Sequence, residues 1–145
     1  MKKIIFCIPQ LYYGGAEQQI KYLANKLINQ YKVIIICFDN ELKIEGVDSN
    51  IKIIKTNKLS LFSLKSLNSI LKFRNHIKGN FVISGSTSFD IICGFFKYFT
   101  NFNWWIRESN SPKYRTINLK IQTRNFLGKN ANGIISNSKA GYLFW

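Results

Sequence analysis

The sequence predicts an α/β fold: a Rossmann-like three-layer sandwich around a mainly parallel sheet of about six strands. Short apolar runs alternate with segments of helical periodicity along the whole chain. This alternation is typical of strand–helix–strand units, which place helices on both faces of a parallel sheet. The length of 145 residues suits one domain, and the hydrophobic share of 46% supplies a core and excludes a disordered chain.

The expected strands are short apolar runs. The first, Lys3–Ile8, is almost continuously apolar, which is typical of a strand buried on both faces. Trp104 and Trp105 are neighbours in the fifth strand, so we expect one of them to face the core. The remaining strands are expected, in chain order, at Val33–Phe38, Ile51–Ile54, Asn80–Ser84, Asn103–Arg107 and Ala131–Ser136.

Helices are expected between these strands. The first two helices are predicted by apolar residues at helical spacing, and the segments 88–99 and 116–127 are also expected to be helical. Ser138 is placed to cap a last helix. The apolar stripe of the first helix is Ala16, Ile20, Leu23, Ala24, Leu27 and Ile28, and that of the second is Leu64, Leu67, Ile70, Leu71, Phe73 and Ile77.

The charge of the chain is large and uneven. Lysine and arginine number 21 against seven acidic residues, for a net charge of +14. Residues 1–50 hold six bases and five acids, so residues 51–145 hold fifteen bases and two acids. A basic half of this kind indicates an anionic partner, such as phosphorylated substrates, an anionic membrane surface or nucleic acid.

The cysteines and the start of the chain indicate a cytoplasmic protein. Cys7, Cys37 and Cys93 lie within apolar runs and form no CxxC pair, so we expect buried free thiols and no metal site. The apolar run at the start stops at Pro9, which favours a strand over a secretory signal. No apolar run is long enough to be a candidate for a transmembrane helix.

Gly14 and Gly15 follow the first strand and open the first helix, with Glu17 in its first turn. Free backbone amides at the N-terminus of a helix favour an anion such as phosphate. The alternative is that a tight turn there needs glycine for a positive φ. The GxGxxG fingerprint and the GxxxxGK[ST] loop are absent, which argues against NAD and ATP sites.

Polar residues also follow the fourth and fifth strands, where open α/β sheets bind ligands. Arg107 offers a planar fork for phosphate or carboxylate, and Glu108 could act as an acceptor or a base. These two could instead pair to close a loop, although neighbours in a strand point to opposite sides. Ser86 and Thr87 could bind sugar hydroxyls or phosphate oxygens, or could cap the next helix. The lone His76 is interpreted as a surface or half-buried residue.

Three segments resemble the family 4 glycosyltransferases. The first is YYGGAEQQIKYLANKL, which is similar to the opening of these enzymes, where GGAE precedes an amphipathic helix. NWWIRESNSP resembles their fifth-strand segment, and NANGIISNSKAGY resembles a later strand-and-helix segment. The three matches occur in order over nearly the whole chain.

The resemblance implies a GT-B fold, in which two Rossmann-like domains face a cleft. In this family the N-terminal domain mainly contacts the acceptor, and its glycine loop approaches the donor phosphates. The C-terminal domain holds the nucleotide sugar with basic residues and an E-x7-E motif. No such motif occurs here, so residues 1–145 are expected to be the N-terminal, acceptor-side domain, with the nucleotide-sugar domain absent: a fragment, a truncated frame or one piece of a split enzyme.

Family roles transfer to a limited set of residues, and none of these is assigned as catalytic. Many relatives place a histidine after the fourth strand, whereas this chain has Ser86 and Thr87 there. No metal or cofactor is expected besides the nucleotide sugar as co-substrate. The loop near the donor diphosphate matches Gly14, Gly15 and Glu17, and the edge of the cleft matches Arg107, Glu108 and Asn110.

The resemblance therefore implies the acceptor-side domain of a retaining glycosyltransferase. The whole enzyme would move a sugar from a nucleotide diphosphate sugar to a glycan or lipid-linked acceptor, and this domain would be inactive alone. The basic half suits peripheral contact with an anionic inner membrane face. The alternative is a basic, non-catalytic module that binds an anionic membrane or nucleic acid, which is supported by charge alone.

Overall fold

The computed structural model describes residues 2–11, 14–38, 45–56, 67–108 and 119–144. These residues form a six-stranded sheet with the order β3-β2-β1-β4-β5-β6, in which every pair of neighbours is parallel. The predicted fold class and all six strands are confirmed. The strands are β1 (Lys3–Cys7), β2 (Lys32–Cys37), β3 (Lys52–Lys55), β4 (Phe81–Ser84), β5 (Asn103–Glu108) and β6 (Gly133–Ser136).

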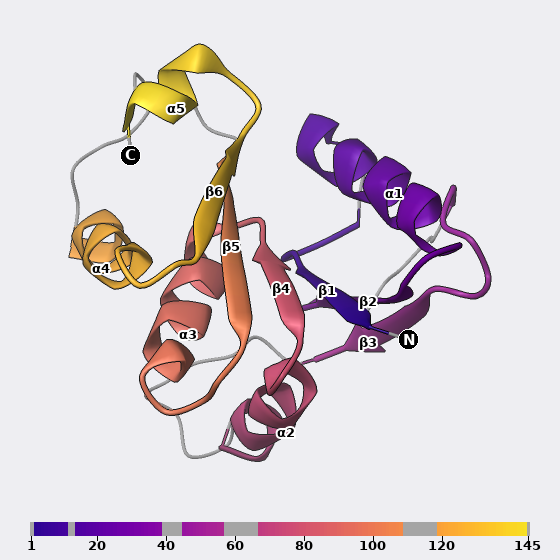
Figure 1. The fold of residues 1–145 in the computed structure, drawn as a ribbon, viewed down its shortest axis with the longest axis horizontal. Helices are drawn as coiled ribbons and strands as arrows, with labels where there is room; N and C mark the ends of the chain where they lie inside the picture. The colour runs from indigo at the N-terminus through magenta and orange to yellow at the C-terminus, as the bar shows by residue number, and fades with distance from the viewer. Residues whose placement is uncertain (1, 12–13, 39–44, 57–66, 109–118, 145) are drawn as a thin grey trace.

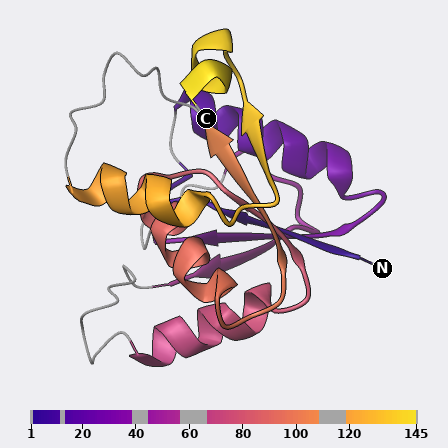
Figure 2. The same cartoon turned by 60° about the vertical axis from the view of Figure 1, so that its left-hand side comes forward.

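Helices cover both faces of this sheet (Figures 1 and 2). The predicted helices are all present, with starts or ends that differ by a few residues, and the part of the second predicted stripe before Leu67 lies outside the described residues. Among the described helices, none is long and apolar enough to cross a membrane. The helices are α1 (Gly15–Leu27), α2 (Leu67–Ile77), α3 (Thr87–Lys97), α4 (Leu119–Gly128) and α5 (Lys139–Phe144).

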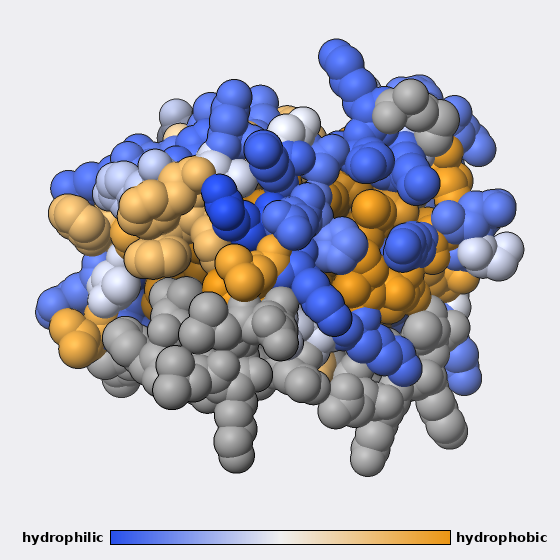
Figure 3. All heavy atoms as spheres, turned by 90° about the horizontal axis from the view of Figure 1, so that it is seen from below, coloured by the Kyte–Doolittle hydropathy of each residue, from blue (hydrophilic) through white to orange (hydrophobic). Residues whose placement is uncertain are grey.

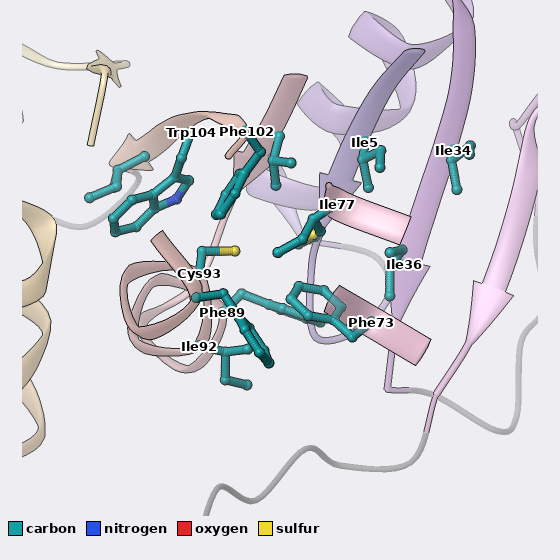
Figure 4. Packing of buried hydrophobic residues seen from close by; sticks show 14 residues of the cluster. Ile5, Ile34, Ile36, Phe73, Ile77, Phe89, Ile92, Cys93, Phe102 and Trp104 are labelled. Carbon is teal, nitrogen blue, oxygen red and sulfur yellow. The ribbon is translucent and has the colours of Figure 1, made fainter. Parts of the chain in front are cut away.

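The core is divided by the sheet into two layers, because successive strand residues point to opposite faces. One layer packs Ile4 and Phe6 of β1 against α1. The other packs Ile5 and Cys7 against α2 and α3, as the close view in Figure 4 shows. Strands buried on both faces must be apolar throughout, which explains the continuous apolar runs of the sequence.

Two expectations about buried residues are confirmed. Trp104 is fully buried in the layer of α2 and α3, whereas Trp105 lies on the other face against Phe81. The three cysteines are buried and free. Burial also raises the pKa of Cys93, so this thiol stays protonated and packs as a small apolar side chain.

The strand order reverses between β1 and β4, and this defines a switch point at the carboxyl edge of the sheet. To one side the chain runs β1, β2, β3, and to the other β4, β5, β6. The backbone amide of Gly85, after β4, donates to the carbonyl of Cys7 at 2.9 Å. A Cβ at Gly85 would lie 3.1 Å from Ile8 and 3.2 Å from Ile20, so glycine permits this close approach. In open α/β sheets, ligands bind in the crevice at such a point.

Candidate functional site

The N-terminus of α1 lies at this switch point and has no side-chain cap. Its N-cap residue, Gly14, has extended backbone angles (φ −121°, ψ 154°), so the alternative in which glycine serves a positive φ there is wrong. A Cβ at Gly14 would lie 2.0 Å from Oε2 of Glu17, so a side chain there would displace this flexible carboxylate. At Gly15 a Cβ would meet no described atom within 4 Å. The first turn of α1 is therefore open at Gly15.

Arg107 reaches this turn from the end of β5. Its side chain donates a hydrogen bond from Nη2 to Oε1 of Gln19 in α1, although only 4% of the residue is exposed. Its Nη1 is buried and has no hydrogen-bond partner among the described residues. Burial lowers the pKa of Arg107, and the nearby carboxylate of Glu17 opposes that shift. A guanidinium with an unused donor beside a helix N-terminus is suited to receive an anion.

Glu108 points to the opposite face of the sheet from Arg107, as the alternation of a strand requires. Its Oε2 accepts a hydrogen bond of 2.9 Å from Nη2 of Arg124 in α4, and both side chains are buried. The loop-closing pair of Arg107 with Glu108 is therefore not formed. The role of Glu108 as an acceptor or base for a ligand stays a prediction, and Asn110 lies outside the described residues.

Arg124 also connects Glu108 to a chain of buried polar groups under the carboxyl edge. Its Nε donates to Oδ2 of Asp90 at 2.5 Å. Oδ1 of Asp90 accepts from the hydroxyl of Ser84 at 2.5 Å, and this hydroxyl accepts from the indole of Trp104 at 2.8 Å. Burial raises the pKa of Asp90 to about 6, and the charge of Arg124 and the bond from Ser84 oppose the rise. Two carboxylates thus share one guanidinium in the core.

This buried network was not predicted. Asp90 and Arg124 stand 34 residues apart, and pairing at that separation cannot be deduced from spacing. One signal was present: Asp90 is the only charge within the apolar segment FDIICGFF. A charge inside an apolar helix must find a partner when the helix is buried, because an unpaired buried charge is costly.

The hydroxyl residues after β4 cap α3. Ser86 is the N-cap, and its Oγ accepts a long hydrogen bond of 3.4 Å from the amide of Phe89. The capping interpretation is thereby confirmed for Ser86, while ligand binding by Ser86 and Thr87 stays a prediction. Ser138 likewise caps α5, because its Oγ accepts from the amide of Gly141 at 3.0 Å.

The fold thus brings three of the predicted segments to one edge of the sheet. The start of α1 carries Gly14 as its N-cap, with Gly15 and Glu17 in its first turn. Arg107 contacts that helix, and Ser86 follows β4 on the other side of the switch point. His76 lies elsewhere, near the end of α2. Within the described ranges, no group of three or more histidine, cysteine or acidic residues could hold a metal ion.

Comparison with known proteins shows the fold. No family model and no curated protein matches the sequence. Among solved structures, the chain is similar to the sucrose-phosphate synthase from Thermosynechococcus elongatus, with a TM-score of 0.65 and 13% sequence identity. The match covers 92% of this chain and 42% of that protein, so the chain spans less than half of its length. This likeness supports a GT-B-like fold for the chain.

Proposed function

We propose that this chain is the acceptor-side, N-terminal domain of a retaining family 4 glycosyltransferase. The enzyme would move a sugar from a nucleotide diphosphate sugar to a glycan or lipid-linked acceptor. The observation that carries the proposal is the placement of Arg107, with its unpartnered Nη1, beside the first turn of α1 at the switch point. The similarity in fold to a sucrose-phosphate synthase supports the same class of reaction.

The chemistry of this edge suits a diphosphate leaving group. When a glycosidic bond to a nucleotide diphosphate breaks, negative charge grows on the phosphate oxygens. Fixed positive groups that face those oxygens stabilise the transition state more than the ground state. The amides of the first turn of α1, which no side chain caps, and the guanidinium of Arg107 would supply such groups. Glu17 would have to share Arg107 with the incoming anion, because its carboxylate lies nearby.

A single Rossmann-like unit offers one wall of a cleft. In the proposed enzyme, the nucleotide sugar is held mainly by a second domain, and this chain presents the acceptor. We therefore expect the protein of 145 residues to turn over sugar nucleotides poorly when it is alone. No metal is proposed, because guanidinium and amide groups would carry the charge of the diphosphate.

The test is release of nucleoside diphosphate from a panel of UDP-, GDP-, ADP- and dTDP-sugars. The chain is assayed alone and with a separately expressed nucleotide-sugar domain. We expect turnover only in the mixture, and we expect Arg107→Gln to reduce it strongly. Arg74→Gln is the matched control, because Arg74 bonds Thr100 away from the site. Appreciable turnover by the chain alone, or an equal loss in both variants, would contradict the proposal.

A further inference from the structure

A separate hollow of about 200 Å³ lies between α2 and the edge strand β3. Its floor is apolar and is formed by Ile36, Ile54 and Phe73. Figure 4 shows Ile36 of β2 and Phe73 of α2 close to each other on this side of the sheet. The hollow shares no residue with the site at the N-terminus of α1, and the proposed glycosyl transfer does not use it.

The rim of this hollow is cationic and hydroxylated. Lys55 and Thr56 contribute from the end of β3, and Ser69, Lys72 and His76 from α2. Each of these side chains can donate a hydrogen bond to an anion, since lysine, serine, threonine and histidine all carry donors. The rim therefore combines two lysines, two hydroxyls and the lone histidine of the chain around one small space.

Two more lysines reach His76 from the sheet. Burial lowers the pKa of His76, and the charges of Lys52 on β3 and Lys3 on β1 lower it further. Lys55 and Lys72 line the same hollow, and none of the described acidic side chains does. Like charges placed together destabilise a fold unless a counter-ion joins them.

The described acidic residues are engaged elsewhere. Asp90 and Glu108 share Arg124 under the carboxyl edge of the sheet. Glu17 lies in the first turn of α1. Glu45 and Asp48 lie beside that helix, where the carbonyl of Glu45 accepts from Nζ of Lys21 and the amide of Asp48 donates to Asn25. The positive charge around the hollow is therefore left for a ligand.

We propose that this hollow binds the phosphoryl group of a small phosphorylated molecule. A phosphoryl dianion carries the charge and the several acceptor oxygens that match two lysines and two hydroxyls. The apolar floor would contact a small organic part of the ligand. The volume of about 200 Å³ suits a small molecule.

The proposal predicts how the affinity for the anion changes with pH. Burial and the charges of Lys52 and Lys3 lower the pKa of His76, and a bound dianion would favour the protonated imidazole and raise it. Binding of the anion is then coupled to uptake of a proton by His76. The affinity should rise as the pH falls, and this coupling should vanish when His76 is replaced by glutamine.

The experiment is an NMR titration of His76 with sulfate, which stays a dianion at these pH values, and then with methyl phosphate. We expect the imidazole signals to shift and saturate, and we expect the sulfate affinity to rise between about pH 7.5 and 5.5. Lys72→Gln should weaken binding about tenfold, as expected for one lost charge-assisted hydrogen bond. In His76→Gln, followed through backbone amides of α2, the affinity should be independent of pH.

Lys26→Gln on α1 is the control for net charge, because Lys26 is exposed on the other face of the sheet. It should change the sulfate affinity by no more than about twofold. The proposal would be overturned if the imidazole signals of His76 did not saturate with sulfate, or if the Lys72 and Lys26 variants lost equal affinity. Either result would show that sulfate only screens charge. Thermal unfolding of each variant shows that the fold is retained.

Discussion

Gly14 and Gly15 are adjacent, yet they serve different purposes at the start of α1. The flexible carboxylate of Glu17 lies where a Cβ at Gly14 would be and would have to move for any larger residue. Gly15 faces open space and adopts a helical conformation that any residue can take. A side chain at position 15 would therefore be tolerated by the fold but would occupy the space through which a ligand reaches the helix N-terminus.

Substitutions at Gly15 should separate folding from binding. Gly15→Ala and Gly15→Val should both fold, with unfolding free energies that differ from the parent by less than about 1 kcal/mol. Valine should reduce the affinity for pyrophosphate far more than alanine, because its two methyl groups cover the amides. Urea unfolding and isothermal titration calorimetry measure the two effects. Equal affinity of the valine variant and the parent would show that ligands do not use this turn.

Asp90 should make stability depend on pH in a particular direction. Its pKa in the folded protein is about 6, and it falls to about 3.9 in an unfolded chain. The folded state therefore holds a proton that the unfolded state has released. The contribution of this group to the free energy of unfolding is fully present below about pH 4 and is lost as the pH rises through about 6.

Asp90→Asn tests this sign. Asparagine cannot titrate, so the free energy of unfolding of this variant should fall less between about pH 4 and 6 than that of the parent. Asp48→Asn is the control, since Asp48 is exposed and its carboxylate accepts only from Asn50 of its own loop. Urea unfolding at several pH values gives the slopes. The same slope for Asp90→Asn and for the parent would show that Asp90 is ionised in the fold throughout this range.

At the scale of elements, α3 and α4 approach each other closely at a single glycine. A Cβ at Gly94 would lie 2.6 Å from Cβ of Leu127 and 3.1 Å from the ring of Trp104. Neither atom can yield freely, because the leucine Cβ is fixed by the backbone of α4 and Trp104 is fully buried. The spacing of the two helices also sets the distance between Asp90 and Arg124, which they carry.

Gly94→Ala should therefore destabilise the protein by about 1–3 kcal/mol, the usual cost of overpacking a core. The matched control is Gly15→Ala, which adds the same methyl group in open space. Urea unfolding compares the two variants. A Gly94→Ala variant as stable as the parent would mean that α4 can move away from α3 without loss.

The sequence predicted the elements well because each depends on local pattern. Buried parallel strands such as Lys3–Cys7 need apolar residues at each buried position, and α1 needs an apolar stripe. Both patterns are visible in the chain. The pairing of Arg124 with Asp90 and Glu108 depends on how helices pack, which no spacing reveals. The alternative of a positive φ at the glycine pair was wrong, because Gly14 is extended and Gly15 is helical.

At the scale of the whole molecule, charge and exposed aromatic residues favour contact with an anionic membrane surface. Phe95, Tyr98 and Phe99 are exposed near the end of α3, on a chain with a net charge of +14. Aromatic side chains of this kind insert at the boundary between water and lipid. The view from below in Figure 3 shows apolar surface among hydrophilic residues.

Sedimentation with liposomes tests this contact. The protein should bind vesicles that contain phosphatidylglycerol and should not bind neutral vesicles. Binding should weaken as salt is added. Phe99→Ser should weaken binding without a change in charge. Leu119→Ser is the control, because Leu119 is an exposed apolar residue on α4. Equal binding to random duplex DNA, with none to liposomes, would favour the non-catalytic nucleic-acid module instead.

The central claim is that the switch point holds a diphosphate between the first turn of α1 and Arg107. The most direct test is a titration of the protein with pyrophosphate, followed through the backbone amides by NMR. The account predicts saturable shifts at Gly14, Gly15 and Ala16 that are lost in Arg107→Gln and kept in Arg74→Gln. Shifts confined to other parts of the chain, or shifts at these amides that persist without Arg107, would contradict it.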